Sequence, residues 1–224
     1  MLIIFDLDDT LIDTSGSIVP FRLEAALKDM IEAGLSILDF NEALSRLKAM
    51  DETAHSTREA LGEFLEIQAA SPHLLDVGCQ AVYGCKDFSF PVAATDDALD
   101  ALLDLYKKHT LAIVSIGVKE IQFEKMKKAG IDTSLFSRII ICQDPFKKQS
   151  YQHLLEDLGV APYNAIVVGD RIKRDLAPAK ALGCKTVHMR WGRGLHQKGD
   201  KEEVDFSIST LDQLRPILAQ LENI

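Results

Sequence analysis

Short, uninterrupted apolar runs recur along the chain and predict buried strands. The first, Leu2–Phe5, ends abruptly at Asp6. Runs of this length that stay apolar at every position are typical of strands buried on both faces, as in parallel sheets. Four further runs have the same character and lie at Leu111–Val114, Ile139–Cys142, Ala165–Val168 and Thr186–Met189.

Helical patterns separate these runs from residue 95 onwards, and the first of them covers Leu99–Tyr106. Three later helical segments, 121–129, 151–158 and 172–182, are each followed by a glycine. Glycine readily adopts the left-handed conformation that ends many helices, so these positions predict helix termini. Strands that alternate with helices in this way predict an α/β core with a parallel sheet of five or six strands.

Residues 15–91 break this alternation. They contain no strand pattern, and apolar residues such as Leu23 and Leu27 recur at helical spacing. An ordinary crossover between parallel strands needs only about a dozen residues or more. The segment therefore predicts a separate helical domain inserted into a core domain formed by residues 1–14 and 92–224. The alternative is a set of helices packed directly on the sheet.

Composition narrows the class of protein. The 224 residues are 47% hydrophobic, and 34 acidic residues against 25 basic ones give a net charge of −9. A nucleic-acid backbone or an anionic membrane attracts a positive surface, so neither is expected as the main partner. No run approaches the roughly 18 apolar residues of a membrane span. Since the first residues also lack the basic leader of a secretory signal, we expect a cytoplasmic protein.

The four cysteines predict neither a disulfide framework nor a zinc site. Cys142 and Cys184 lie beside apolar runs and are expected to be buried as small hydrophobic residues. Cys79 and Cys85 lack the spacing of zinc ligands. Free thiols agree with the expected cytoplasmic location.

Polar residues that can perform chemistry follow four of the predicted strands. In chain order these residues are Asp6, Asp8 and Asp9, then Ser115, Ile116 and Gly117, then Lys147 and Lys148, and finally Asp170 with Asp175. In open parallel sheets the carboxyl ends of the strands lie along one edge, where ligands bind. We therefore expect these residues to gather at that edge.

The residue types in this group suit phosphoryl chemistry assisted by a metal ion. Several carboxylates close together repel one another unless a cation joins them, and oxygen ligands without thiol or imidazole favour Mg²⁺. A lysine and a serine hydroxyl beside the metal can neutralise and hydrogen-bond phosphoryl oxygens. A carboxylate held in line with the scissile bond can attack phosphorus and form an aspartyl-phosphate.

The order of these motifs resembles that of the haloacid dehalogenase superfamily. The resemblance covers roughly residues 1–190 and rests on Asp6-Leu7-Asp8-Asp9-Thr10, Ser115, a following lysine, and Gly169-Asp170 with Asp175. It implies a three-layer, Rossmann-like α/β core. The helical insertion at 15–91 is similar to the C1-type cap domain of that family.

The resemblance also implies a role for each acidic residue. Asp6 is expected to be the nucleophile. Asp8 is expected to protonate the leaving oxygen as an acid and then to activate water as a base. Asp6, Asp170 and the backbone carbonyl of Asp8 are expected to hold Mg²⁺, and Asp175 is expected to support the metal site.

The phosphate-binding residues follow from the same resemblance. Ser115, with the backbone N–H groups of Ile116 and Gly117, is expected to bind phosphate oxygens. The active-site lysine is expected to be Lys147 or Lys148, and the sequence leaves the choice open because both precede an aromatic residue and follow a proline.

Asp8 favours one activity within this superfamily. Phosphatases and phosphomutases have an acid two residues after the nucleophile, whereas dehalogenases lack it because their ester needs no protonated leaving group. We therefore predict a Mg²⁺-dependent phosphatase that acts on a small phosphorylated metabolite. The alternatives are a sugar-phosphate mutase of the same superfamily and a scaffold of the same fold that binds a partner without catalysis.

Overall fold

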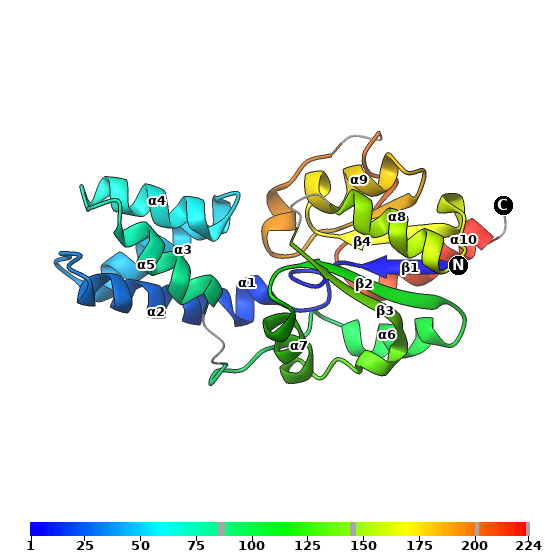
Figure 1. The fold of residues 1–224 in the computed structure, drawn as a ribbon, viewed down its shortest axis with the longest axis horizontal. Helices are drawn as coiled ribbons and strands as arrows, with labels where there is room; N and C mark the ends of the chain where they lie inside the picture. The colour runs from blue at the N-terminus through cyan, green and yellow to red at the C-terminus, as the bar shows by residue number, and fades with distance from the viewer. Residues whose placement is uncertain (85–87, 144–146, 200–201, 223–224) are drawn as a thin grey trace. The chain divides into compact units, whose positions relative to one another are not determined.

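The protein is described by a computed structural model that covers residues 1–84, 88–143, 147–199 and 202–222 (Figure 1). The chain divides into two compact units. The α/β unit consists of Met1–Asp13 together with Val92–Ile224, and the helical unit is the intervening segment Thr14–Pro91.

The α/β unit is built around a parallel sheet with the order β3-β2-β1-β4-β5-β6 in the described part of the chain. The strands are β1 (Leu2–Phe5), β2 (Thr110–Ile116), β3 (Phe136–Cys142), β4 (Ala165–Gly169), β5 (Lys185–Met189) and β6 (Phe206–Ile208). The predicted parallel sheet is thus confirmed. The apolar runs did not reveal β6, because this edge strand is only three residues long and contains a serine.

Helices cover both sides of the sheet, with α8 and α9 on one side and α6 and α7 on the other, which gives the predicted three layers (Figure 1). The helices of this unit are α6 (Ala98–Tyr106), α7 (Lys119–Lys128), α8 (Lys148–Asp157), α9 (Ala177–Lys180) and α10 (Leu214–Glu222). Short turns of 3₁₀ helix lie at η2 (Thr133–Leu135), η3 (Pro162–Asn164), η5 (Gly192–His196) and η6 (Leu211–Gln213), and a turn of π helix lies at η4 (Ile172–Leu176).

Side chains from three neighbouring strands form the core on the α8 side of the sheet. Leu2 and Ile4 of β1, Val114 of β2 and Val167 of β4 pack with Tyr151 of α8, and each of these residues is at most 1% exposed. Burial of an aliphatic side chain of this size contributes about 1.5–3 kcal/mol. The strands that carry the site residues are therefore among the best anchored parts of the unit.

The strand order reverses beside β1, which pairs with β2 on one side and with β4 on the other. Phe5 is in register with Ile113 and with Val168, and the N–H of Asp6 donates to the carbonyl oxygen of Val168 over 2.9 Å. Open α/β sheets bind ligands at such a reversal, beyond the carboxyl ends of the strands. The residues that follow β1, β2 and β4 meet there.

One predicted helix is divided in the structure. The segment 172–182 begins as the π turn η4 and continues as the short helix α9. Pro178 has no N–H to donate to a carbonyl one turn earlier, so a regular helix cannot run across this junction. π turns occur frequently at functional sites, and this turn carries Asp175.

The helical unit has a core of its own. It contains α1 (Thr14–Ser17), α2 (Val19–Glu32), α3 (Phe40–Thr53), α4 (Thr57–Ile67), α5 (Leu74–Cys79) and a π turn η1 (Gln80–Gly84). Leu23, Leu27 and Phe64 are fully buried members of its apolar cluster. Asp39 and Ser56 cap α3 and α4, because each side chain accepts a backbone N–H of the first turn. Residues 14–84 and 88–91 contain no strand.

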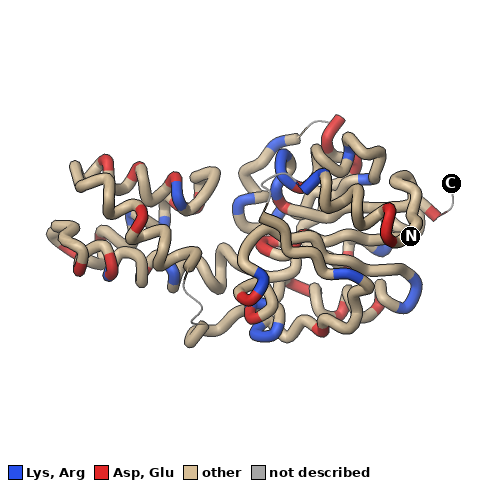
Figure 2. Tube along the Cα trace, viewed as in Figure 1, with Lys and Arg blue, Asp and Glu red and all other residues tan. Residues whose placement is uncertain are grey.

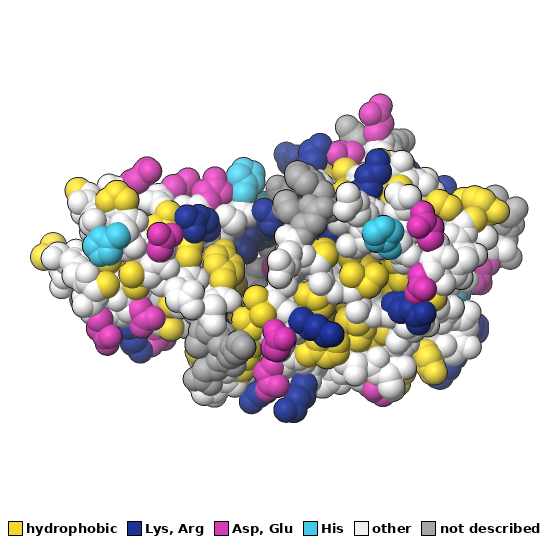
Figure 3. Space-filling view, viewed as in Figure 1, with side chains coloured by type: hydrophobic (Ala, Val, Ile, Leu, Met, Phe, Trp, Pro, Cys, Tyr) yellow, Lys and Arg dark blue, Asp and Glu magenta, His cyan; other side chains and the backbone are white. Residues whose placement is uncertain are grey.

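Charge is mixed along the chain. Lys and Arg positions are interspersed with Asp and Glu positions in both units (Figure 2). Hydrophobic side chains on the visible surface of the α/β unit are interrupted by charged ones (Figure 3). Within the described ranges, no helix combines the length and the apolar character needed to cross a membrane.

Candidate active site

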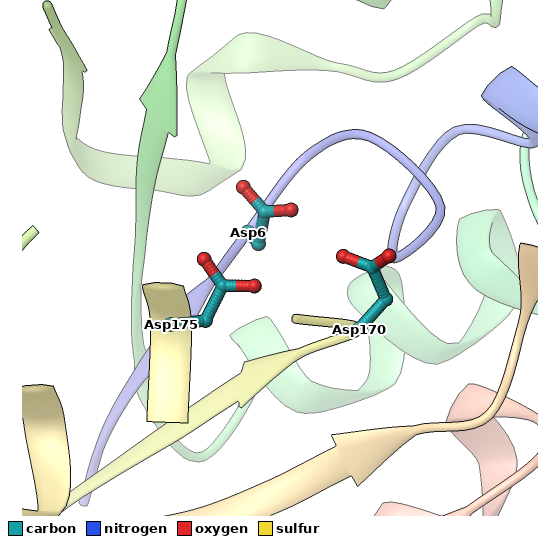
Figure 4. A group of neighbouring side chains, drawn as sticks. All are labelled: Asp6, Asp170 and Asp175. Carbon is teal, nitrogen blue, oxygen red and sulfur yellow. The ribbon is translucent and has the colours of Figure 1, made fainter. Parts of the chain in front are cut away.

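Three buried aspartates meet at the carboxyl edge of the sheet (Figure 4). Asp6 follows β1, Asp170 follows β4 and Asp175 lies in the π turn η4. One carboxylate oxygen from each lies within 4.8 Å of the other two. The residues are only 6%, 2% and 1% exposed, respectively. Asp6, Asp170 and Asp175, which were expected to gather at this edge, thus lie together in the structure.

Glycines and backbone hydrogen bonds hold these aspartates in place. A Cβ atom on Gly169 would lie 2.7 Å from the Cβ atom of Asp175, so only glycine leaves room for this carboxylate beside β4. The N–H of Arg171 donates to Oδ2 of Asp175 over 2.9 Å. A Cβ atom on Gly194 would lie 3.1 Å from that of Asp170, which shows that the loop after β5 packs closely on Asp170. His188 of β5 supports the same residue, because its Nε2 lies 3.2 Å from the Asp170 carbonyl oxygen.

Lys147 lies within the acidic cluster, and Lys148 does not. The Nζ atom of Lys147 is 2.5 Å from Oδ1 of Asp6 and 2.7 Å from Oδ1 of Asp175, and the residue is 1% exposed. Lys148 begins α8 and is exposed. The difference follows from helical spacing, since Lys147 continues the buried stripe of α8 and lies one turn before Tyr151. The proline of this motif, Pro145, lies outside the described residues.

The electrostatics of the cluster favour a further positive charge. Burial raises the pKa of Asp6 from 3.8 to about 7, although the Lys147 ammonium group acts in the opposite direction. Burial also raises the pKa of the Asp170 carboxyl group well above its usual range, and the neighbouring Asp175 adds to this effect. Burial alone would lower the pKa of Lys147, but Asp175 and Asp6 together raise it well above its ordinary value. One ammonium group is therefore shared by Asp6 and Asp175 within a cluster of three carboxyl groups.

The donor set fits a hard divalent cation. Oδ1 of Asp170 is buried and has no hydrogen-bond partner among the described residues. A buried polar atom without a partner is costly, and a bound cation removes that cost. All three side chains in the group offer carboxylate oxygen, which is the ligand type that Mg²⁺ prefers.

Because the pKa of Asp6 is raised, the difference in thermal stability between the wild type and Asp6→Asn is expected to depend on pH. The comparison is made in excess chelator, so that no metal ion is bound. Between about pH 4 and pH 7 the folded state keeps a proton on Asp6 that the unfolded state releases. The stability contributed by this proton is present below about pH 4 and is lost as the pH rises through about 7. The melting temperature of Asp6→Asn relative to the wild type is therefore expected to rise by several degrees from about pH 4 to pH 8, since about 1 kcal/mol corresponds to roughly 2–4 °C for a chain of this size. Melting curves whose difference does not change with pH would contradict the shift.

Asp8 and Ser115 lie beside two residues that the sequence analysis did not select. The Nε2 atom of Gln122 lies 2.9 Å from Oδ2 of Asp8 and 2.8 Å from Oγ of Ser115. The Nζ atom of Lys125 lies 2.8 Å from Oδ1 of Asp8. Gln122 and Lys125 are three residues apart on α7 and so share one face of this helix. The sequence gives no signal for that face, because a polar residue on a helix ordinarily faces water, whereas Gln122 is only 2% exposed.

A tight turn after Asp6 brings Asp8 back toward the sheet. The N–H groups of Leu11 and Ile12 both donate to the carbonyl oxygen of Leu7, each over 2.9 Å. Asp9 adopts a left-handed conformation with a φ of 56°, and its N–H donates to the carbonyl oxygen of Ile12 over 2.7 Å. Asp9 is thus buried and forms part of the turn. The side chain of Asp8, by contrast, is 31% exposed.

Gly117, whose N–H was expected to bind a phosphate oxygen, lies at the end of the sheet. The N–H of this residue donates to the carbonyl oxygen of Cys142 over 3.0 Å. The predicted second strand ended at Val114, but β2 continues to Ile116 and its pairing with β3 extends to Cys142. The Gly117 N–H therefore has a backbone partner at the end of the sheet in this structure. The Ile116 carbonyl oxygen accepts from Gln122 over 3.1 Å, so this residue also adjoins the site.

Comparison with known proteins identifies the family. The model of the haloacid dehalogenase-like hydrolases matches residues 1–183, and the chain belongs to this family. A relative from Methanocaldococcus jannaschii is 29% identical over 98% of this chain and 97% of its own length, and one from Pyrococcus furiosus is 29% identical over 97% and 92%. Both bear the name glyceraldehyde 3-phosphate phosphatase.

A solved structure supports the same fold. The crystal structure of a predicted phosphoglycolate phosphatase from Haemophilus somnus superposes with a TM-score of 0.74 and is 19% identical. The match covers 97% of each chain. The resemblance predicted from the four motifs is thus confirmed at the level of family and fold.

Proposed function

We propose that this protein is a Mg²⁺-dependent phosphatase that hydrolyses a small phosphomonoester through an aspartyl-phosphate on Asp6. The observation that carries the proposal is the buried Asp6 carboxylate, which lies beside Lys147 and close to Asp170. Asp8, two residues further on, supplies a second carboxyl group whose position is set by two donors. A nucleophile beside an acid–base group is the arrangement that covalent phosphoryl transfer needs.

The carboxylates fit the metal that this family commonly uses. Asp6, Asp170 and the backbone carbonyl of Asp8 would hold Mg²⁺, whereas Asp175 keeps its ion pair with Lys147. When bound, the ion neutralises negative charge on the phosphoryl oxygens.

Two chemical steps follow from the proposed roles. In the first, an Asp6 carboxylate oxygen bonds to phosphorus as the ester P–O bond breaks, and Asp8 gives its proton to the departing alkoxide. In the second, Asp8 takes a proton from water, whose oxygen attacks the phosphoryl group and releases phosphate from Asp6. Lys147 and Ser115 bind the phosphoryl oxygens during both steps.

The substrate proposed for the first test is glyceraldehyde 3-phosphate, because relatives that match almost the whole chain bear its name. The experiment is a panel of small phosphorylated metabolites in which released inorganic phosphate is measured. Phosphate release separates hydrolysis from the transfer that a mutase performs. Failure to hydrolyse any phosphomonoester in the presence of Mg²⁺ would overturn the proposed function.

Removal of divalent metal ions is expected to abolish hydrolysis, and addition of Mg²⁺ is expected to restore it. Ca²⁺ is not expected to replace Mg²⁺, because it is larger and recruits more oxygen ligands, which can include both carboxylate oxygens of the nucleophile. The measurement is phosphate release after chelation and after addition of each ion. Full activity in excess chelator would contradict the metal requirement.

A further inference from the structure

We infer that Gln122 and Lys125 are positioning residues that orient the Asp8 carboxylate for proton transfer, and that Gln122 also orients the Ser115 hydroxyl toward the phosphoryl group. This inference rests on the proposed function and assigns roles to two residues of α7 that lie beside the site.

The contacts account for both carboxylate oxygens of Asp8. Lys125 lies 2.8 Å from Oδ1 and the Gln122 amide lies 2.9 Å from Oδ2. The Asp8 side chain is 31% exposed and that of Lys125 is 13% exposed, so the ion pair is partly shielded from water. A carboxylate held at one oxygen can rotate about its Cβ–Cγ bond, whereas one held at both oxygens cannot. The two donors together thus fix the direction of the proton that Asp8 gives or takes.

The surroundings of Gln122 establish which end of its amide faces the site. The carboxylate of Asp8 and the carbonyl oxygen of Ile116 can only accept hydrogen bonds, and both lie within 3.1 Å of Nε2. The amide NH₂ group must therefore point toward them. Oγ of Ser115 is a third acceptor, 2.8 Å from Nε2, so one of the two amide hydrogens is shared between two acceptors. Because Ser115 accepts this bond, its own hydroxyl hydrogen remains available to donate to a phosphoryl oxygen.

Packing alone does not explain a glutamine at this position. The neighbouring buried residue of α7 is the apolar Met126, and burial of an amide is costly unless its hydrogen bonds are made. The partners of the amide are the proposed acid–base residue, the proposed phosphate ligand and the backbone between them.

Lys125→Met provides the first test, with Lys128→Met as a matched control, since Lys128 is an exposed lysine on the same helix. The parameter kcat/KM covers only the steps up to release of the alcohol. An alkyl leaving group needs a proton from Asp8, whereas nitrophenolate needs little. In Lys125→Met, kcat/KM for an alkyl phosphate is expected to fall about tenfold to 100-fold, which is part of the roughly 10²–10⁴-fold that acid–base catalysis supplies. For 4-nitrophenyl phosphate, kcat/KM is expected to fall less than about threefold. Lys125→Arg should recover part of the loss.

Gln122→Met tests the second contact, because methionine keeps the length of the side chain and removes its donors. The same dependence on leaving group is expected. In addition, competitive inhibition by inorganic phosphate should weaken in Gln122→Met but not in Lys125→Met, since it is the Gln122 amide that lies 2.8 Å from the Ser115 hydroxyl oxygen. Thermal melting of each variant checks that the fold is retained.

The possible outcomes separate this inference from the function on which it rests. Equal losses on the two esters, or a Lys125→Met variant as active as Lys128→Met, would overturn the positioning role while wild-type hydrolysis still supported the phosphatase. Failure of the wild type to hydrolyse any phosphomonoester in the presence of Mg²⁺ would overturn both.

Discussion

Asp6→Ala is expected to show no measurable phosphate release from any substrate that the wild type hydrolyses. Uncatalysed hydrolysis of phosphate monoesters is so slow that enzymes accelerate it by up to about 10²¹-fold, so a variant without its nucleophile has no alternative route of comparable speed. Lys147 keeps its other partner, Asp175, at 2.7 Å, so the variant should still fold. The measurement is phosphate release at high enzyme concentration, together with a melting curve.

Asp157→Ala is a suitable control for Asp6→Ala. This aspartate lies on α8, is 54% exposed and pairs with Arg138 over 2.7 Å. Exposed ion pairs contribute little to stability, about 0–1 kcal/mol, so the control should fold and turn over like the wild type. Full activity of Asp6→Ala would exclude Asp6 as the nucleophile, and equal loss in both variants would point to damage elsewhere.

Asp8→Ala is expected to lower kcat/KM by a factor that depends on the leaving group. General acid catalysis typically supplies about 10²–10⁴-fold, and an alkyl phosphate should lose most of that, whereas 4-nitrophenyl phosphate should lose little. The second step needs Asp8 as a base for every substrate, because the same aspartyl-phosphate is hydrolysed. Hence kcat should fall even for nitrophenyl phosphate. Steady-state kinetics on the two esters measure both effects, and an identical decrease in kcat/KM on both would exclude Asp8 as the general acid.

The strand ends could be predicted from the sequence because they depend on local pattern. Leu2–Phe5 is apolar at every position and stops at Asp6, and Ala165–Val168 stops just before Gly169 and Asp170. Parallel strands then place these ends together without knowledge of any side-chain contact. This reasoning brought Asp6, Asp170 and Asp175 to one edge of the sheet, where the structure has them within 4.8 Å of one another.

Features that depend on contacts distant in sequence could not be predicted in the same way. Gln122 and Lys125 touch Asp8 across 114 and 117 positions of the chain, and a polar residue on a helix ordinarily faces water. The Gly117 N–H donates to the carbonyl oxygen of Cys142 because β3 extends alongside the end of β2. The sequence pattern of one strand does not reveal how far its neighbour extends.

The choice between Lys147 and Lys148 depended on a detail of helical phase. Tyr151, Leu154 and Leu155 form the buried side of α8, and a step of four residues back from Tyr151 leads to Lys147. The periodicity was therefore present in the sequence. It becomes decisive only once α8 is known to begin at the carboxyl edge of the sheet with its buried side packed on the strands.

The aspartyl-phosphate on Asp6 is tested most directly by mass spectrometry of Asp8→Ala that has been quenched with acid during turnover of 4-nitrophenyl phosphate. The variant can still form the aspartyl-phosphate with this leaving group, but it lacks the base that hydrolyses it, so the intermediate should accumulate. We expect one phosphate added to the peptide that contains Asp6, and no addition in Asp6→Ala. A phosphate found on Ser115 instead, or no adduct while turnover continues, would contradict this expectation.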